Sequence, residues 1–150
     1  MAKRKGSKAA LMIMLFIGIG GIILWAALNL SDKAQETGIE LPSKASRVEF
    51  LNSFGLIVDP EPEIQDIKIP YEFGEIYNAY NELQRSQGLD LEKYAGADAV
   101  LLRYKVLNCP DYPENVTANL VLCSNILIAC DITLNEEGGF TKALIPESVT

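Results

Sequence analysis

An uncharged run of 20 residues near the N-terminus constrains this chain more than any other feature of its sequence. Residues 9–28 read AALMIMLFIGIGGIILWAAL. A helix of this length spans about 30 Å, which matches the hydrocarbon core of a bilayer. Because the run is apolar on every side, it does not suit a surface helix of a small domain, which needs a polar face. The sequence therefore predicts a transmembrane helix over residues 9–28.

The charges beside this run predict its orientation. Residues 1–8 contain no acidic residue and four basic ones, Lys3, Arg4, Lys5 and Lys8. Basic residues that flank a membrane helix stay in the cytoplasm. We expect a cytoplasmic head over residues 1–8, a single-pass signal anchor in the cell membrane and an extracytoplasmic C-terminal part. A cleaved signal peptide is the alternative, although cleavage after Ala27 would place Trp25 where signal peptidase prefers a small residue.

The overall charge excludes several classes of function. The 150-residue chain has 13 basic residues, 20 acidic residues and no histidine, which gives a net charge of −7. Because four basic residues precede residue 9, residues 29–150 hold 9 basic and 20 acidic groups, a net charge of −11. A domain this acidic repels nucleic-acid phosphates, so we expect no nucleic-acid partner. Without histidine, the chain has no Ser-His-Asp triad, Cys-His dyad or histidine-ligated metal site.

Composition divides the part beyond the membrane run into three segments. Residues 29–42 are mostly polar or small, have no apolar period and end at Pro42, which is typical of a linker. Residues 43–135 contain the periodic apolar patterns expected of one domain. Residues 136–150 have no such pattern and are predicted to form a loose C-terminal tail.

Two helices are expected in the domain. Ser43 begins a short helix that ends before Gly55, a residue common at helix C-termini. The clearest helix covers residues 71–87, and a single further turn is expected over 89–94. Apolar residues at helical spacing predict one buried stripe on the clearest helix, formed by Phe73, Ile76, Tyr77, Tyr80 and Leu83.

The strands are concentrated in the C-terminal half. Apolar patterns predict three strands of an antiparallel meander, over residues 100–107, 116–123 and 126–134. Ser124 and Asn125 are expected to make a tight turn, and the hairpin is apolar on both faces, so it is central or carries a bulge. Shorter extended pieces are expected over 56–58 and 64–69. The predicted fold is α+β, a two-layer domain with the helices on one face of a C-terminal antiparallel sheet, the three-stranded meander plus short N-terminal strands.

The three cysteines predict neither a disulfide nor a metal site. Because Cys109, Cys123 and Cys130 are an odd number, at least one thiol stays unpaired. Their positions lack the short spacing that a cysteine metal site uses, and no histidine is present to deprotonate a thiol. We therefore expect buried, unreactive thiols, no metal, no cofactor and no catalytic residue set.

Two features are candidates for a functional role. Tyr112 lies between two prolines in the loop that joins the first two meander strands, where a rigid aromatic side chain should be exposed. Tyr112, with its neighbours Asp111 and Glu114, is the candidate surface for binding a partner. Asp131 interrupts an otherwise apolar strand, so it is either a functional acid or an outward-facing position.

Several short motifs resemble those of an uncharacterised bacterial family. They are RVEFLNSFG at 47–55, IPYEF at 69–73, YNELQ at 80–84, YKV at 104–106 and DI at 131–132. Over residues 45–140 the chain resembles the family catalogued as domain of unknown function 4830. The resemblance implies a short protein of a Gram-positive bacterium, often with one N-terminal membrane segment. It implies no activity and no catalytic residues.

Together these features favour a binding function. We expect a non-enzymatic, membrane-anchored extracytoplasmic module of the bacterial envelope that binds a protein or an envelope component. One alternative is an envelope hydrolase with paired carboxylates, using Asp98 or Asp131 with a nearby glutamate. Another is a small-ligand sensor, which would need a membrane partner because only eight residues precede the membrane run.

Overall fold

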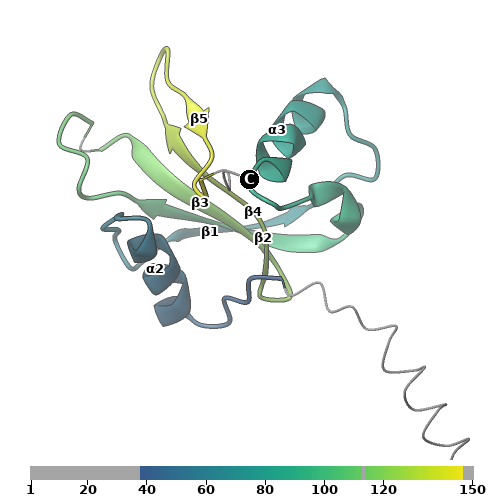
Figure 1. Ribbon diagram of the computed structural model, residues 1–150, viewed down its shortest axis with the longest axis horizontal. Coiled ribbons are helices and arrows are strands. Elements are labelled where there is room, and N and C mark those ends of the chain that lie inside the picture. The colour runs from purple at the N-terminus through teal and green to yellow at the C-terminus, as the bar shows by residue number, and fades with distance from the viewer. Residues whose placement is uncertain (1–37, 113, 147–150) are drawn as a thin grey trace, which may run out of the picture. The chain divides into compact units, whose positions relative to one another are not determined.

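The computed structural model describes residues 38–112 and 114–146, which contain an antiparallel sheet with helices on both sides (Figure 1). The expected cytoplasmic head, the membrane run over 9–28 and residues 29–37 of the expected linker lie outside the described residues. Residues 113 and 147–150 lie outside them as well. Among the residues described, no helix is both long and apolar enough to cross a membrane.

Five antiparallel strands form one sheet and are neighbours in the order in which they follow along the chain. They are β1 (Glu63–Lys68), β2 (Asp98–Lys105), β3 (Val116–Cys123), β4 (Ile126–Leu134) and β5 (Thr141–Lys142). Strands β2, β3 and β4 confirm the predicted meander, and β1 confirms the extended piece predicted over 64–69. The piece predicted over 56–58 contributes an isolated bridge between Val58 and Val106. The fold class is α+β with an antiparallel sheet.

The β3–β4 hairpin contains both the expected turn and a bulge. Ser124 and Asn125 have φ angles of 49° and 70°, the positive values that a two-residue hairpin turn requires. The register shifts between Val121 and Leu122, where β4 contains one extra residue. Beyond the bulge, the side chains of β4 therefore lie on the face opposite to that of an unbroken register. The shift places Asp131 across from a polar residue of β3 instead of an alanine.

The two helices lie on opposite faces of the sheet, so the predicted two-layer arrangement with both helices on one face is wrong (Figure 1). Helix α2 (Lys44–Ser53) packs through Leu51 against one face, which includes Leu102 and Leu120. Helix α3 (Glu75–Arg85) and the 3-10 turn η1 (Leu91–Tyr94) cover part of the other face. The central strands are apolar on both faces, and each face needs cover to remove its side chains from water.

Local signals determine where α2 begins and ends. The Ser43 hydroxyl accepts a hydrogen bond from the Ser46 N–H at 3.0 Å, and the Ser46 hydroxyl accepts one from the Ser43 N–H at 3.1 Å. This reciprocal capping box satisfies two N–H groups that have no partner inside the helix. After the helix, Gly55 adopts a φ of 80°, which glycine tolerates without strain. The start and the end predicted for this helix are confirmed.

Both flanks of the expected 43–135 domain take part in the fold. On the N-terminal side, the Leu127 N–H donates to the Ile39 carbonyl at 2.8 Å, and Leu41 is buried. On the C-terminal side, β5 pairs with β4, and Leu144 is buried. Residues 38–42 and 136–146 are thus attached to the domain, where the sequence predicts a linker and a loose tail. Each segment is attached by a single buried leucine, Leu41 or Leu144. A single apolar residue produces no periodic pattern, so the sequence does not predict its burial.

Two buried glutamines, Gln84 in the last turn of α3 and Gln87 just after the helix, hydrogen-bond to the backbone of β4 where β5 no longer pairs with it. The Gln84 Oε1 accepts the Cys130 N–H at 2.9 Å, and the Gln87 Nε2 donates to the Cys130 carbonyl at 2.9 Å. The Gln87 Oε1 also accepts the backbone N–H groups of Leu144 and Ile145, each at 2.8 Å. These side-chain amides replace the hydrogen bonds of a neighbouring strand, so they attach α3 and the C-terminal segment to the sheet.

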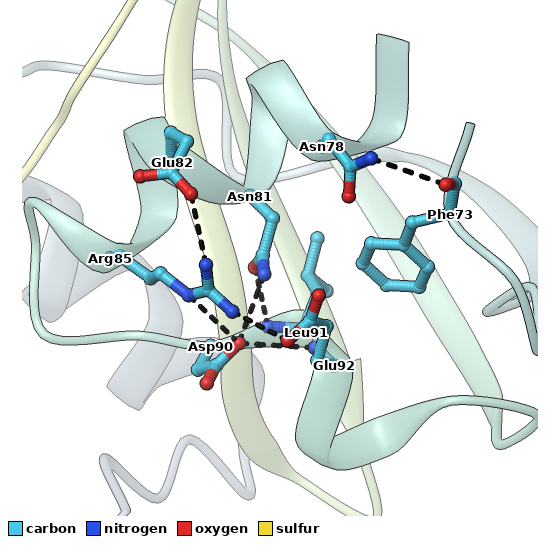
Figure 2. A network of polar contacts seen from close by, with 8 residues as sticks. All are labelled: Phe73, Asn78, Asn81, Glu82, Arg85, Asp90, Leu91 and Glu92. Carbon is cyan, nitrogen blue, oxygen red and sulfur yellow. Dashed lines mark hydrogen bonds and ion pairs between the residues drawn. The ribbon is translucent and has the colours of Figure 1, made fainter. Parts of the chain in front are cut away.

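A polar network joins α3 to η1 (Figure 2). The Asn81 Nδ2 donates to Asp90 Oδ1 at 3.0 Å, and its Oδ1 accepts the Leu91 N–H at 2.7 Å. Arg85 forms ion pairs with Asp90 and Glu92 on the outside of the same network. The hydrogen bond from Asn81, with the Glu92 N–H and Arg85 adding to it, holds the pKa of the Asp90 carboxyl below its ordinary value. Asn81 therefore links the helix to the turn that seats Leu91 in the core.

Replacing Asn81 with alanine should lower the free energy of unfolding by about 2 kcal/mol, because the Leu91 N–H then has no acceptor in a buried position. Asn78 provides the matched control, since its side chain donates to the Phe73 carbonyl at an exposed position (Figure 2). Asn78→Ala should cost less than about 1 kcal/mol. Urea denaturation of the two variants tests the difference, and equal losses would contradict a specific role for Asn81.

Candidate functional site

The apolar stripe predicted for α3 is not buried along its whole length. Ile76 is 85% exposed and Tyr77 is 43% exposed, so the prediction that Tyr77 belongs to the core is wrong. Asn81 and Gln84 face the interior of the domain instead. Their hydrogen bonds to Leu91 and Cys130 set the rotation of the helix about its axis. This rotation leaves the N-terminal part of the apolar stripe beside an open groove.

The groove lies between α3 and the sheet and has a volume of about 800 Å³. One wall is the exposed apolar side of α3, with Ile76, Tyr77, Ala79, Tyr80 and Leu83. Its apolar floor comes from β1, the segments beside it, η1 and the central strands, with Ile67, Ile69, Leu91, Leu101 and Val121. Its polar part contains Gln65, Arg103, Asn119, Asp131, Thr133 and Thr141. A groove of this size, mostly apolar with a few convergent polar groups, is typical of a binding site.

Asp131 lies in the polar part of the groove and is only 3% exposed. Its Oδ2 accepts the Tyr80 hydroxyl at 2.7 Å. Its Oδ1 accepts the Asn119 Nδ2 at 2.7 Å and the Thr133 hydroxyl at 2.8 Å. Of the two roles left open by the sequence, the outward-facing position is wrong, because Asp131 is buried under α3. Three hydrogen bonds from neutral groups offset part of the loss of water around this carboxylate.

Two groups next to Asp131 are held in their protonated forms: Tyr80 in the groove lining, and Cys130, which precedes Asp131 in β4 and lies in the core on the other face. Burial first, and then the carboxylate of Asp131, raise the pKa of the Tyr80 phenol. Tyr80 therefore stays a hydrogen-bond donor to Asp131 at neutral pH. Burial and the same carboxylate raise the pKa of the Cys130 thiol to about 12, so Cys130 does not supply a thiolate nucleophile at neutral pH.

Arg103 is the cationic residue of the groove lining, and its side chain is bound by residues of β1. Its guanidinium donates to Gln65 Oε1 at 2.9 Å and pairs with Glu63 Oε1 at 3.3 Å. Both partners lie on the edge strand, on the side of Arg103 away from β3. The arginine is therefore directed toward β1 and away from Asp131 on β4.

The loop predicted to bind a partner is separate from the groove lining. Tyr112 is 38% exposed, and Asp111 and Glu114 are also exposed. Glu114 forms an ion pair with Lys105 of β2. The groove lining includes Asp131 but none of these three loop residues. The candidate residues chosen from the sequence thus belong to two different surfaces.

Sequence reasoning missed the partners of Asp131. Asn119 lies directly across from Asp131 in the β3–β4 register, and Thr133 follows on the same face. Asn119 is a polar residue in the apolar pattern of β3, just as Asp131 is in that of β4. Two polar interruptions in adjacent strands could have suggested that these residues pair. Without the bulge, however, the register would place Asp131 opposite Ala118.

A comparison with protein-family models matches residues 50–132 to Domain of unknown function (DUF4830). Searches of curated proteins and of solved structures find no match to the chain. The matched segment covers more than half of the 150 residues and includes α3, strands β1 to β3, and Asp131 in β4. The chain therefore belongs to the DUF4830 family.

Proposed function

We propose that this protein is a non-enzymatic binding module and that its ligand occupies the groove between α3 and the sheet. The observation that carries the proposal is the placement of Ile76 and Tyr77, which α3 leaves exposed on the groove wall. A helix normally buries its apolar stripe, because each exposed apolar side chain forgoes a favourable transfer from water. A ligand seated in the groove would cover these side chains.

Binding is better supported than hydrolysis by paired carboxylates. Asp131 is the acid of the groove lining, and that lining contains no second carboxylate among the described residues. Asp98, the other acid considered, is at the start of β2, exposed, and lies 3.7 Å from Lys68. A pair of catalytic carboxylates must flank one substrate bond, within about 10 Å of each other.

We propose further that the module is anchored in the membrane with the groove outside the cell. The apolar run over 9–28 and the basic residues before it support this orientation. The ligand would then be an envelope component, and a sensor role would require a second membrane protein. Protease added to intact cells should degrade the domain over residues 38–146, and a domain that resists until the cells are lysed would contradict the orientation.

The groove can be tested with a photo-crosslinking amino acid at Ala79, an exposed position of the groove lining, in the full-length chain in cells. Ile76→Lys should reduce the crosslinking of the ligand at least about tenfold, because it places a positive charge on the apolar wall. The free energy of unfolding of this variant should change by less than about 0.5 kcal/mol, since Ile76 is almost fully exposed.

Ile64→Lys is the matched control for this experiment. Ile64 is also an exposed isoleucine, but it lies on β1 outside the groove lining. This variant should leave the crosslinking at Ala79 unchanged. If crosslinking at Ala79 survives Ile76→Lys and the capture of the ligand depends on Tyr112 instead, the binding site lies on the loop over 109–115.

A further inference from the structure

The polar part of the groove contains a buried acceptor that has no donor. The Oδ1 of Asn119 is buried and has no hydrogen-bond partner among the described residues. The Nδ2 of the same amide donates to Asp131 Oδ1 at 2.7 Å and contacts the Thr133 hydroxyl at 3.3 Å. These two acceptors determine which end of the amide points toward Asp131. The atom of Asn119 that has no partner is therefore the acceptor Oδ1, which can accept a hydrogen bond from a ligand.

The carboxylate of Asp131, beside Asn119, has no positively charged partner. Asp131 takes part in none of the ion pairs formed by the described residues. Its three hydrogen bonds come from neutral groups, and Oδ2 accepts the Tyr80 hydroxyl alone. Arg103, the cation of the groove lining, is engaged by Glu63 and Gln65 on β1. A buried carboxylate is favourable when a positive charge or further donors compensate for its lost hydration.

We propose that the groove binds a small organic amine, with its protonated nitrogen between Asp131 Oδ2 and Asn119 Oδ1. This inference rests on the proposed function and adds the chemical class of the ligand. An ammonium group has three donors, no acceptor and a positive charge. Its donors match the two acceptor oxygens, and its charge matches the carboxylate of Asp131. The apolar body of the amine lies against Ile76, Tyr77 and Leu101. The volume of about 800 Å³ suits a small molecule.

The charge of the domain favours the same class of ligand. Residues 38–146 contain 17 acidic and 8 basic residues, a net charge of −9, which attracts cations toward the groove. An anionic ligand would have to displace Glu63 or Gln65 from Arg103 and would approach the carboxylate of Asp131 on the same face. Charge complementarity thus distinguishes an amine from a carboxylate of the same shape.

The experiment compares three probes that share a phenylalkyl body: 2-phenylethylamine, 2-phenylethanol and 3-phenylpropionate. Each is titrated against the full-length chain in lipid nanodiscs, with isotope-labelled isoleucine methyl groups observed by NMR. Ile67, Ile69 and Ile76 report on the groove, while Ile57 and Ile64 are exposed isoleucines outside its lining. The amine should shift the groove signals alone and bind at least about tenfold more tightly than the other two probes, since it alone adds a charge-assisted contact.

Asp131→Asn keeps the size of the side chain and removes its charge. In this variant the amine should lose its preference over the alcohol, because the charge-assisted contact is gone. If Asp131→Asn does not fold, the comparison of the three probes on the unaltered chain still tests whether the groove prefers an amine. Equal binding of all three probes in the groove, or tighter binding of the carboxylate, would overturn the amine and leave the groove as a binding site. No shift of a groove methyl with any probe would overturn both proposals.

Discussion

Replacing Gln87 with alanine should lower the free energy of unfolding by about 4 kcal/mol, because several buried backbone groups lose their hydrogen-bond partner at once. Its buried amide donates to the Cys130 carbonyl and accepts the N–H groups of Leu144 and Ile145. Truncation leaves three backbone groups without these partners, and each unsatisfied buried group costs about 1–3 kcal/mol. Urea denaturation of the full-length chain in detergent, followed by near-ultraviolet circular dichroism, measures the loss.

Gln65 provides the control for this substitution. It is an exposed glutamine on β1 that accepts a hydrogen bond from Arg103, so Gln65→Ala should cost less than about 1 kcal/mol. Hydrogen exchange adds a local measurement, because the amides of Leu144 and Ile145 should exchange much faster in Gln87→Ala. Similar losses for the two glutamines, with unchanged exchange at Leu144, would show that Gln87 does not attach the C-terminal segment.

Replacing Asp131 with alanine should lower the free energy of unfolding by about 3 kcal/mol. The substitution removes the acceptor of Tyr80, Asn119 and Thr133 at once. Tyr80→Phe keeps the aromatic ring and loses one hydrogen bond to a charged group, so it should cost about 2 kcal/mol. Because the two residues share that bond, the double variant should lose less than the sum of the single losses. Asp111→Ala, in the exposed loop, is the control and should cost less than about 0.5 kcal/mol.

The same pair predicts how stability changes at alkaline pH. The pKa of Tyr80 in the folded domain lies above that of an unfolded tyrosine, which is about 10. Its contribution to stability is therefore fully present below pH 10 and is lost as the pH rises further, because the unfolded chain then releases a proton that the folded chain retains. Tyr80→Phe should show a shallower loss above about pH 10 than the unaltered chain. Parallel pH profiles would contradict a buried Tyr80–Asp131 pair.

The candidate site shows where sequence reasoning reaches its limit. Asp131 is recognisable because a charged residue interrupts an apolar strand, but its surroundings depend on the bulge at Val121 and Leu122. One extra residue moves Asp131 from the face covered by α2 to the face covered by α3. The groove itself follows from the rotation of α3, which hydrogen bonds of Asn81 and Gln84 decide. Polar side chains with long-range partners leave no periodic signal in the sequence.

Elements that depend on neighbours along the chain could be predicted from the sequence. Local propensity and alternation predict the start of α2 at Ser43, the turn at Ser124 and Asn125, and the three meander strands. Three other features depend on tertiary contacts: the face that each helix covers, the residues that pair across the bulge, and the hydrogen-bond partners of Gln87. Those choices depend on contacts between segments as far apart as Gln87 and Leu144, which local patterns do not encode.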